Sequence, residues 1–446
     1  MNSNILFFVI DAFRADHCKN DNKSFSTLNL DKLIKRGISF NQAISSADAT
    51  SVSLGSIFTG LNPYNSEIYT YKTKSNKPNF FNHLQNSGYN IYITVPNSMA
   101  IKRLSSNFNS PKSIFQSLVQ HLDEGYGDEI IKRLDKSNLK EPWIHLIHLM
   151  DLHYPIIIPK EFDSKKFGTN EYERSISVTD YWLGKFLEKI NLKSTLVIIT
   201  ADHGEYVSKS NTRDLDYEPE FKNIIKAGTK LLPKTFRPSA KKIIQNTKTS
   251  IKNIRFNKAT KDLTELQKRN LRTRAGWYLH DELIRVPLIF TGNHISETKI
   301  ISNQVACIDI FPTILDLIGL PSMDEKIDGR SLVPLIKNEL FIENPIYLEA
   351  ASVIPTELTG NVVGIRSSEY KYFRSRKLSK DNIHLYDLKN DPLEEINLAK
   401  TNPEIVEKME LILLSFLEKS DNIILGNKID EETKEIHQEL KKLGYV

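Results

Sequence analysis

The sequence predicts an α/β fold in which helices cover both faces of a mainly parallel central sheet, a three-layer sandwich. Three apolar, β-branched runs, residues 4–10, 143–150 and 194–200, are each followed within two positions by an aspartate. Such runs are typical of strands buried on both faces of a parallel sheet. Helical and strand patterns alternate between them, as crossover connections require.

The domain organisation follows from length and pattern. A chain of 446 residues is long enough for one large domain with a smaller appendage. We expect a main domain over 1–343, with a basic insertion or lid at 206–275. A C-terminal α+β subdomain over 344–446 should contain short strands near Val362, Tyr372 and Leu385 and end in a helical tail.

The cellular compartment is predicted from three absences. No apolar run approaches the ~18 to 20 residues of a transmembrane segment. The first residues lead directly into a strand that is too short for a signal sequence. Only two cysteines, Cys18 and Cys307, are present, which suits a reducing compartment. We therefore expect a soluble, cytoplasmic protein.

Candidate metal ligands stand where the predicted strands end. Asp11, Asp151, His153, Asp202 and His203 all follow apolar runs. The carboxyl ends of strands in an open α/β sheet gather ligands, and carboxylate and imidazole groups bind divalent cations. An Asp in such a place is also a preferred helix N-cap, so one pair alone leaves both interpretations open.

The intervening elements are predicted in order. Helices are expected near 30–36, 80–87 and 175–190, and a strand over Asn90–Val95. The stretch 45–60 is rich in small hydroxyl residues and opens a helix, which suits either an N-cap or a nucleophile held at the positive end of a helix.

Several ordered motifs up to about Ala399 together resemble the sulfatase branch of the alkaline phosphatase superfamily. The resemblance implies an alkaline phosphatase-like central sheet. The motifs that carry it are residues 4–17, 50–63, 148–155, 200–205, 279–289, 309–321, 328–332 and 385–392.

The resemblance also implies roles for particular residues. Asp11, Thr50, Asp202 and His203 would hold a divalent cation, whether calcium, magnesium, manganese or zinc. Thr50 stands at the nucleophile position. His153 would contact the substrate anion or protonate the leaving group, with a second metal as a further possibility.

The nucleophile position departs from the family pattern. Ordinary sulfatases carry Cys or Ser there, with Pro and Arg two and four positions later, and convert it to formylglycine. This chain has Thr50, Val52 and Leu54. Oxidation of Thr would give a ketone, and a sulfated Thr would expose a crowded sulfur to water. A phosphorylated Thr is more tractable, so phosphorus chemistry is favoured.

The anion-gripping position also departs from the family. Before Leu279, sulfatases place a Lys and many phosphoesterase relatives a His, whereas this chain has Ala275 and Gly276. Arg274 and His280 are the substrate-binding candidates that would compensate. Asp151 is a third candidate for the pocket.

Two histidines and one acid have ordinary structural interpretations. His145 and His148 lie within an apolar run, so we expect satisfied structural histidines rather than ligands. Asp180 lies in a predicted packing helix and is expected to be a solvated or capping acid.

The predicted insertion is strongly basic. Eighteen Lys and Arg stand against six Asp and Glu between residues 209 and 274. The excess suits a lid or patch that attracts an anionic substrate, glycan, lipid headgroup or nucleic acid, although no specific nucleic-acid motif is present. A solvated helical excursion is the alternative.

Three functions remain after these observations. The first is a metal-dependent hydrolase of sulfate or phosphate esters, with phosphorus favoured by Thr50. The second is a transferase that moves a phospho-headgroup onto a glycan or lipid. The third is a catalytically degenerate binding protein, which the missing Lys or His and the presence of Leu54 would explain.

Overall fold

The structure is a computed structural model of the chain. It describes residues 3–18, 25–96, 98–105, 107–108, 114–207, 256, 258, 260–271, 278–323, 326–352, 360–377, 380 and 382–418. The chain forms two compact units, one of residues 1–205 with 274–446 and the other of residues 206–273.

An eight-stranded sheet organises the first unit, with strand order β4-β3-β5-β1-β6-β7-β2-β8. Every neighbouring pair is parallel except those of β7, which runs antiparallel to β6 and β2. The predicted mainly parallel sheet is confirmed. The strands are β1 (Asn4–Ile10), β2 (Ile38–Ile44), β3 (Asn90–Val95), β4 (Ile114–Gln116), β5 (Trp143–Leu149), β6 (Thr195–Thr200), β7 (Arg285–Gly292) and β8 (Lys299–Ala306).

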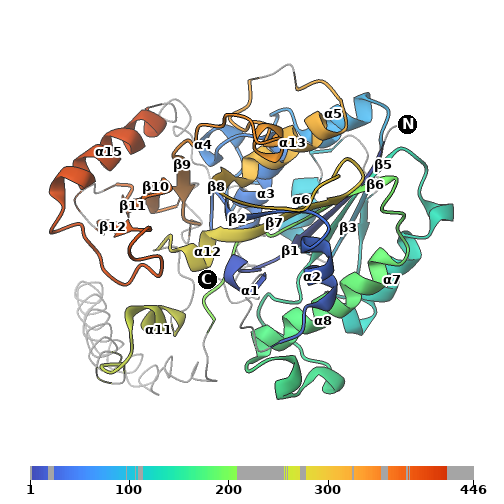
Figure 1. Ribbon diagram of the computed structural model, residues 1–446, viewed down its shortest axis with the longest axis horizontal. Coiled ribbons are helices and arrows are strands. Elements are labelled where there is room, and N and C mark those ends of the chain that lie inside the picture. The colour runs from blue at the N-terminus through green and yellow to red at the C-terminus, as the bar shows by residue number, and fades with distance from the viewer. Residues whose placement is uncertain are drawn as a thin grey trace, which may run out of the picture. The chain divides into compact units, whose positions relative to one another are not determined.

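Helices cover both faces of this sheet, which confirms the three-layer arrangement (Figure 1). One face carries α2 (Leu28–Ile34), α7 (Tyr126–Arg133) and α8 (Glu171–Leu187), and the other carries α3 (Thr50–Thr59), α5 (Phe80–Asn86) and α13 (Ile310–Leu317). The shorter helices of this unit are α1 (Ala15–Cys18), α4 (Pro63–Ser66), α6 (Met99–Ser105), α12 (Asp281–Ile284) and α14 (Val333–Ile336).

The central strands are buried along their whole length because helices pack on both sides. All seven residues of β1 are buried. The ring of Phe7 in β1 lies edge to face with the ring of Phe311 in α13, with 5.4 Å between the ring centroids. The ring centroid of Phe58 in α3 lies 6.3 Å from that of Phe311. These contacts fix α3 over the sheet and so fix the position of its first residue, Thr50.

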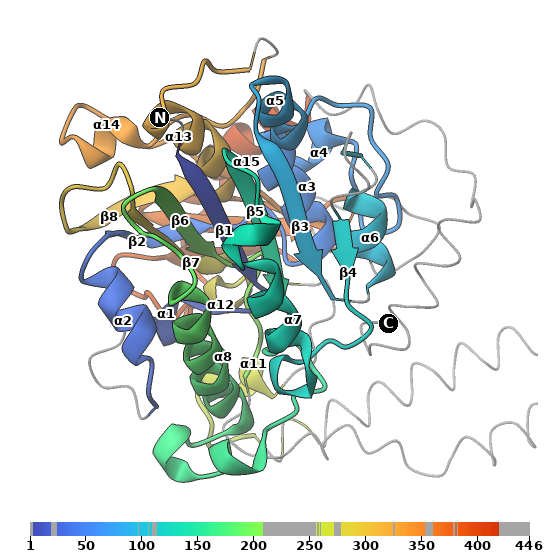
Figure 2. The same cartoon turned by 90° about the vertical axis from the view of Figure 1, so that its right-hand side faces the viewer.

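The carboxyl ends of β1, β5 and β6 meet at one edge of the sheet (Figure 2). Ile10 pairs with Leu149 of β5, and Val9 pairs with Thr200 of β6, so the residues after each strand emerge together. The Asp11 N–H extends the ladder by donating to the Leu149 carbonyl at 2.8 Å.

A smaller antiparallel sheet lies at the C-terminal end of the chain, as predicted. Its order is β12-β11-β10-β9, and α15 packs on it through Met409 and Leu413. A parallel bridge between Ala47 and Glu349 joins this sheet to the segment before α3. Its elements are β9 (Ile346–Glu349), β10 (Val362–Arg366), β11 (Tyr370–Ser375), β12 (His384–Asp387) and α15 (Pro403–Leu417).

The second unit is described only in part. Its one described helix is α11 (Glu265–Asn270), which begins with a capping box between Thr264 and Gln267. Most of the predicted basic lid, 206–275, lies outside the described residues. Where helices are described, none is long and apolar enough to cross a membrane.

Candidate active site

Asp11, Asp202 and His203 come together at the carboxyl edge of the main sheet. One ligand atom from each lies within 4.8 Å of the other two, and all three residues are buried. Within the described part of the chain, this is the one group of three such residues close enough to hold a metal ion. We call these three residues the edge cluster.

A strained backbone turn aims Asp11. Ala12, directly after it, has a φ of 60°, a left-handed conformation that costs an L-residue about 1 kcal/mol or more. The turn is held at both ends, because the Ala12 N–H donates to Asp202 Oδ1 at 3.3 Å and its carbonyl accepts from the Tyr172 hydroxyl at 2.6 Å.

The turn after β6 is fixed just as closely. The hydroxyls of Ser45 and Ser53 donate to the Asp202 carbonyl at 2.6 and 2.5 Å. Gly204 admits no side chain, since a Cβ there would lie 2.1 Å from the carbonyl oxygen of Glu282 in α12. The Asp-His-Gly motif therefore needs its glycine so that α12 can pack against the turn.

The hydrogen bonds of His203 determine which ring nitrogen faces the cluster. Nδ1 lies 2.9 Å from the Gly204 carbonyl, which only accepts, so Nδ1 carries the proton. In the neutral ring Nε2 then keeps its lone pair. Nε2 lies 3.4 Å from Asp202 Oδ2 and 3.2 Å from Thr50 Oγ1. This tautomer is the one that a metal-binding histidine requires.

The two aspartates of the edge cluster have opposite pKa shifts. Burial tends to raise the pKa of Asp11, but the hydrogen bond from His148 and the charges of His203 and His153 hold the pKa below its usual range. Burial and the neighbouring charge of Asp11 raise the pKa of Asp202 to about 7. Two carboxylates this close cannot both ionise easily without a cation between them.

Two buried oxygens support a divalent cation in this place. Asp11 Oδ1 and Asp202 Oδ2 have no hydrogen-bond partner among the described residues. A buried carboxylate oxygen without a donor is costly, and a cation would satisfy both. Together with His203 Nε2 they form an oxygen and nitrogen donor set that fits a divalent metal.

Thr50 is the first residue of α3 and faces the edge cluster. Its Oγ1 lies 3.3 Å from Asp11 Oδ2. The preceding residue, Ala49, makes no side-chain capping hydrogen bond, and the N-terminus of a helix is an environment that favours a nearby anion. The structure thus places all four predicted metal residues, Asp11, Thr50, Asp202 and His203, in mutual contact.

The same motifs are matched by a known family. Residues 3–320 match the sulfatase family, and residues 275–419 match the C-terminal domain of N-sulphoglucosamine sulphohydrolase. This chain belongs to the sulfatase family. That family comprises hydrolases of sulfate esters, and the match to it spans more than half of the chain.

Curated relatives of the sulfatase family are similar over part of the chain. Human arylsulfatase K is 29% identical over 145 residues, which are 31% of this chain and 27% of the relative. A Δ4,5-hexuronate-2-O-sulfatase of Bacteroides thetaiotaomicron is 29% identical over 161 residues, 35% of this chain and 33% of the relative. The match therefore spans only about a quarter to a third of the length of these relatives.

Solved structures share the fold over nearly the whole chain. A 2-O GAG sulfatase superposes with a TM-score of 0.65 at 16% identity, covering 97% of this chain and 96% of the other. A phosphonate monoester hydrolase of Agrobacterium radiobacter gives a TM-score of 0.65 at 15% identity, covering 94% and 96%. At these identities the likeness shows the sulfatase fold and no more.

Within the sulfatase fold, Val52 and Leu54 serve the core. Their side chains are only 3% and 1% exposed. Positions 52 and 54, where the family has Pro and Arg, are therefore apolar packing positions of α3 in this chain. Neither position supplies a charged side chain that could bind an anion beside Thr50.

His148 belongs to the site, although it was interpreted as a structural residue. Its Nε2 lies 3.2 Å from Asp11 Oδ2, where it donates to the carboxylate and orients it. The signal available in the sequence was its place one residue before the end of a strand beside β1. His145 is structural as predicted: its Nε2 contacts Thr94 Oγ1 at 2.8 Å, and burial lowers its pKa to about 3.

Asp151 and His153 lie beyond His148 at the end of β5. Asp151 Oδ1 accepts from the Leu122 N–H at 3.0 Å, and burial raises the pKa of Asp151 to about 7. The charge of His153 acts on Asp11, so His153 lies within electrostatic range of the edge cluster. His121, which the sequence did not single out, has its Nδ1 4.0 Å from Asp151 Oδ1.

Of the two predicted substrate-binding residues near 280, the structure describes only His280, which packs away from the edge cluster. His280 is 2% exposed, with Nε2 3.3 Å from the Tyr386 hydroxyl and its ring stacked on Tyr278 at 5.4 Å. It packs among aromatic residues of the C-terminal sheet, which corrects the expectation of an anion contact. Arg274 lies outside the described residues.

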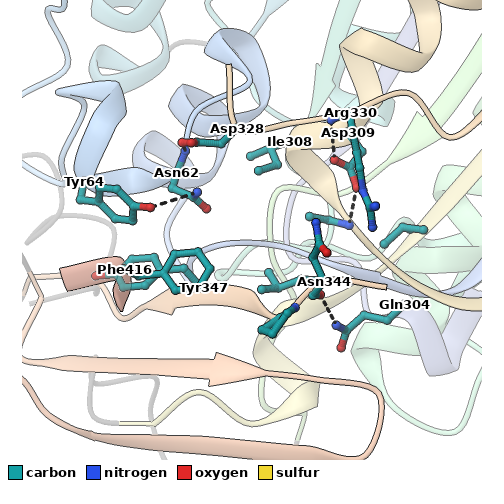
Figure 3. A pocket seen from close by; sticks show the side chains of 14 residues that line it. Asn62, Tyr64, Gln304, Ile308, Asp309, Asp328, Arg330, Asn344, Tyr347 and Phe416 are labelled. Atoms are coloured by element: carbon teal, nitrogen blue, oxygen red, sulfur yellow. Dashed lines mark hydrogen bonds between the residues drawn. The ribbon is translucent and has the colours of Figure 1, made fainter. Parts of the chain in front are cut away.

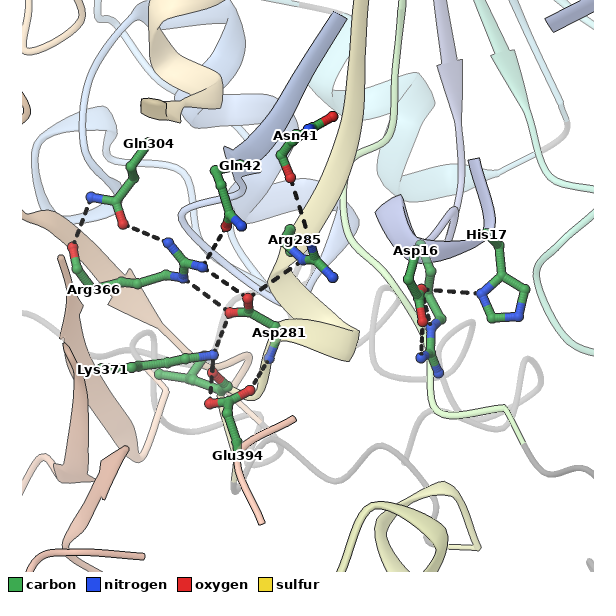
Figure 4. Close-up of polar contacts among 12 residues, drawn as sticks. Asp16, His17, Asn41, Gln42, Asp281, Arg285, Gln304, Arg366, Lys371 and Glu394 are labelled. Atoms are coloured by element: carbon green, nitrogen blue, oxygen red, sulfur yellow. Dashed lines mark hydrogen bonds and ion pairs between the residues drawn. The ribbon is translucent and has the colours of Figure 1, made fainter. Parts of the chain in front are cut away.

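A buried ion network holds α12 against the turn after β6 (Figure 4). Asp281 accepts from Lys371 Nζ at 2.6 Å and from Arg366 at 2.9 Å, and Lys371 also meets Glu394 at 2.7 Å. Lys371 and Arg366 belong to the C-terminal sheet. The sheet therefore fixes α12, and the Leu283 carbonyl of α12 accepts from the Gly204 N–H at 2.7 Å.

A cavity of about 270 Å³ lies between the end of α3, the end of β8 and the start of β9 (Figure 3). None of the edge cluster lines it. It is lined by Asn62, Tyr64, Gln304, Val305, Ala306, Ile308, Asp309, Asp328, Arg330, Asn344, Pro345, Ile346, Tyr347 and Phe416.

Proposed function

We propose that this chain is a metal-dependent hydrolase that uses Thr50 as a nucleophile on a sulfate or phosphate ester, with phosphorus as the preferred centre. The placement of Thr50 Oγ1, 3.3 Å from Asp11 Oδ2 and 3.2 Å from His203 Nε2, carries the proposal. The hydroxyl stands at the N-terminus of α3 and against the best candidate cation site in the described chain.

The residues divide the work between binding and positioning. Asp11, Asp202 and His203 would hold the cation, whose positive charge favours the ionised Thr50 oxygen. His148 orients Asp11, and the serines behind Asp202 fix its backbone. The N–H groups at the start of α3 face the anion and stabilise charge that develops on its oxygens.

The identity of the nucleophile, a threonine, supports hydrolysis of a phosphate ester rather than a sulfate ester. Thr50 cannot become formylglycine, so a covalent ester on it must be cleaved by water at the central atom. Water attacks a phosphoryl threonine more readily than a crowded sulfated one. The fold is compatible with phosphorus chemistry, since a phosphonate monoester hydrolase shares it.

Substrate and compartment belong to the same proposal. The relatives include a Δ4,5-hexuronate-2-O-sulfatase, which makes an anionic glycan ester the first substrate to test, with a lipid headgroup ester beside it. The chain has only two cysteines, Cys18 and Cys307, and so small a number suits a reducing, cytoplasmic setting.

The test joins metal analysis with turnover on matched esters. Purified protein is assayed with 4-nitrophenyl phosphate, bis(4-nitrophenyl) phosphate and 4-nitrophenyl sulfate, and protein quenched during turnover is examined by mass spectrometry. We expect a phosphoryl adduct on Thr50 that is absent from Thr50→Ala, and partial activity in Thr50→Ser because the nucleophilic oxygen survives.

Other outcomes assign the alternatives. Product formation that depends on an added glycan or lipid acceptor indicates a transferase. Anion binding without turnover of any ester indicates a degenerate binding protein. Undiminished activity in Thr50→Ala would make Thr50 a helix-capping position and refute the proposed nucleophile.

A further inference from the structure

The helix that carries the nucleophile, α3, begins without a side-chain cap of its own. An N-cap side chain normally fixes the first turn of a helix by accepting a hydrogen bond from one of its free N–H groups. The N-cap residue of α3 is Ala49, which makes no such bond. The position of Thr50 therefore depends more than usual on contacts between the start of α3 and other segments.

The segment that leads into α3 is joined to the end of β9. Ala47 and Glu349 form a parallel bridge, and the Glu349 N–H donates to the Ser46 carbonyl at 2.9 Å. Because the bridge is parallel, the residues after Glu349 run in the same direction as those that lead to Thr50. The C-terminal sheet thus continues alongside the approach to the nucleophile.

Asp48 makes the next contact along this pair of segments. Its side chain is buried, and its Oδ1 accepts from the Ala351 N–H at 2.5 Å. The side chain of Ala351 packs against the small apolar cluster of Ala47, Ala49 and Val52. The residue directly before the nucleophile is therefore in a cluster to which the C-terminal sheet contributes.

Residues 350–352 are themselves firmly held. The Ala350 N–H donates to the Val362 carbonyl of β10 at 3.0 Å, and the Ser352 N–H donates to the Thr70 hydroxyl at 3.1 Å. Together with the Ala351 N–H, three successive donors are used by three different segments. The partner of Asp48 is thus a fixed point of the fold.

Thr50 lies between two anchors. Two residues before it, Asp48 is bonded to the C-terminal sheet, and three residues after it, the Ser53 hydroxyl donates to the Asp202 carbonyl at 2.5 Å. Loss of either anchor would let the Thr50 hydroxyl move relative to the edge cluster. A displacement of about 1 Å in a catalytic group can lower a rate about 10²-fold.

We propose that Asp48 is a positioning residue for Thr50, and that the C-terminal sheet sets the place of the nucleophile through the hydrogen bond between Asp48 and the Ala351 N–H. This inference rests on the proposed function. In this role Asp48 neither touches the substrate nor exchanges a proton. It holds the first turn of α3 against the edge cluster.

Separate measurement of kcat and KM tests the positioning role. Asp48→Ala removes the acceptor of the Ala351 N–H and frees the start of α3. We expect kcat on 4-nitrophenyl phosphate to fall roughly 10 to 10²-fold, and KM to change less than about threefold. Asp48→Asn keeps an oxygen at the Oδ1 position, so it should restore most of kcat.

A second variant loosens the same contact from the other side. Thr70→Val keeps the shape of the side chain but removes the acceptor of the Ser352 N–H. Residues 350–352 then lose one of their three anchors, whereas the bond to Asp48 remains. We expect kcat to fall in the same direction as in Asp48→Ala, but by less.

Asp180→Ala is the matched control. Asp180 is also a buried aspartate that accepts from a backbone N–H at a helix start, since its Oδ1 lies 2.7 Å from the Leu30 N in the first turn of α2. Its loss should lower Tm about as much as Asp48→Ala does, and leave kcat within about twofold of the wild type. All rates are measured well below the Tm of each variant.

Binding of a divalent cation distinguishes a displaced nucleophile from a damaged edge cluster. Calcium, magnesium, manganese and zinc chlorides are added in turn, and the change in Tm is recorded. Asp48→Ala should keep most of the rise seen in the wild type, because Asp11, Asp202 and His203 are unchanged. Complete loss of the rise would show a collapsed site and overturn the positioning role.

The remaining outcomes distinguish this inference from the proposed function. Unchanged kcat in Asp48→Ala overturns the inference and leaves the Thr50 chemistry intact. Equal losses of kcat in Asp48→Ala and Asp180→Ala, or an Asp48→Asn variant as slow as Asp48→Ala, also overturn it. Wild-type protein that hydrolyses no ester overturns the proposed function and this inference together.

Discussion

The edge cluster and the ion network of α12 are both buried groups of carboxylates, but their partners differ. In the network, Asp281 has Lys371 at 2.6 Å and Arg366 at 2.9 Å. In the edge cluster, Asp11 and Asp202 meet histidines and the Thr50 hydroxyl, and each keeps one oxygen that has no hydrogen-bond partner among the described residues. The carboxylates of the ion network are neutralised by Lys and Arg side chains of the protein. Those of the edge cluster would be neutralised by a bound cation.

The pKa values follow the same division. Burial would raise the pKa of Asp281, but Arg366 and Lys371 hold it well below the usual range. Burial and the charge of Asp11 leave the pKa of Asp202 at about 7. Buried charge is tolerated in proteins when it is paired, so a cation bound at the edge cluster would relieve the repulsion between its two carboxylates.

The largest effect is expected from Asp202→Ala. Losing one ligand of the edge cluster should lower kcat/KM by roughly 10³-fold or more. The unfolding free energy should fall by about 1–3 kcal/mol, because the Ala12 and His203 N–H groups lose their acceptor. Activity on the preferred ester and urea unfolding measure the two quantities. Retained activity would remove Asp202 from the site.

Lys371→Met tests the other region. It leaves Asp281 and Glu394 buried without their ammonium group, which should cost about 3–5 kcal/mol of unfolding free energy. Arg285→Met is the matched control: its guanidinium lies 3.5 Å from Asp281 and is 27% exposed, so the cost should stay under about 1 kcal/mol. Equal costs in urea unfolding would contradict the division drawn between the two regions.

A divalent cation should stabilise the folded protein by binding at the edge cluster and not at the ion network of α12. At a hundred times its Kd, a cation that binds only folded protein adds about 2.7 kcal/mol, visible as a rise in Tm that a chelator reverses. Asp202→Ala should abolish the rise, whereas Lys371→Met should retain it from a lower starting Tm. A rise that survives in Asp202→Ala would place the cation elsewhere.

Asp309 is a third buried carboxylate, intermediate between those of the edge cluster and the ion network in how well it is stabilised. The change in stability expected from it is the smallest. It has two backbone N–H donors, from Ala306 and Arg330 at 3.0 Å each, and burial raises its pKa to about 6. The folded state then holds the proton more tightly than the unfolded state, so stability falls as pH rises from the unfolded pKa near 3.8 through 6. Between pH 4 and 6 the loss should be roughly 2 kcal/mol.

Asp309→Asn isolates this loss from that of other titrating groups. The variant cannot take up the proton, so its urea unfolding free energy should decline less over the same pH interval. Parallel declines in the variant and the wild type would show that Asp309 ionises equally in both states.

Local pattern predicted several elements almost to the residue. The expected strand Asn90–Val95 is β3, and the helix expected at 80–87 is α5, Phe80–Asn86. The helix expected from 175 begins earlier, at Glu171, because the Asn170 side chain caps it by accepting from the Glu173 N–H. The direction of β7 was not predictable, since a fully buried strand has the same apolar pattern whichever way it runs.

The sequence by itself determined which residues follow the central strands. An apolar run that ends in an acid places that acid at the carboxyl edge, so Asp11 and Asp202 could be assigned there before any fold was seen. The helix that begins at Thr50 was likewise marked by its small hydroxyl residues and its apolar continuation.

Only the tertiary structure decided which residues from other segments reach that edge. His148 and His121 lie 137 and 30 positions from the carboxylates that they face, Asp11 and Asp151, and no local periodicity carries such pairings. His280 follows a family motif in sequence, yet side-chain packing turns it into the aromatic residues of the C-terminal sheet. Strand ends are set by local hydrophobicity, whereas contacts between side chains are set by sheet order and packing, which depend on the whole chain.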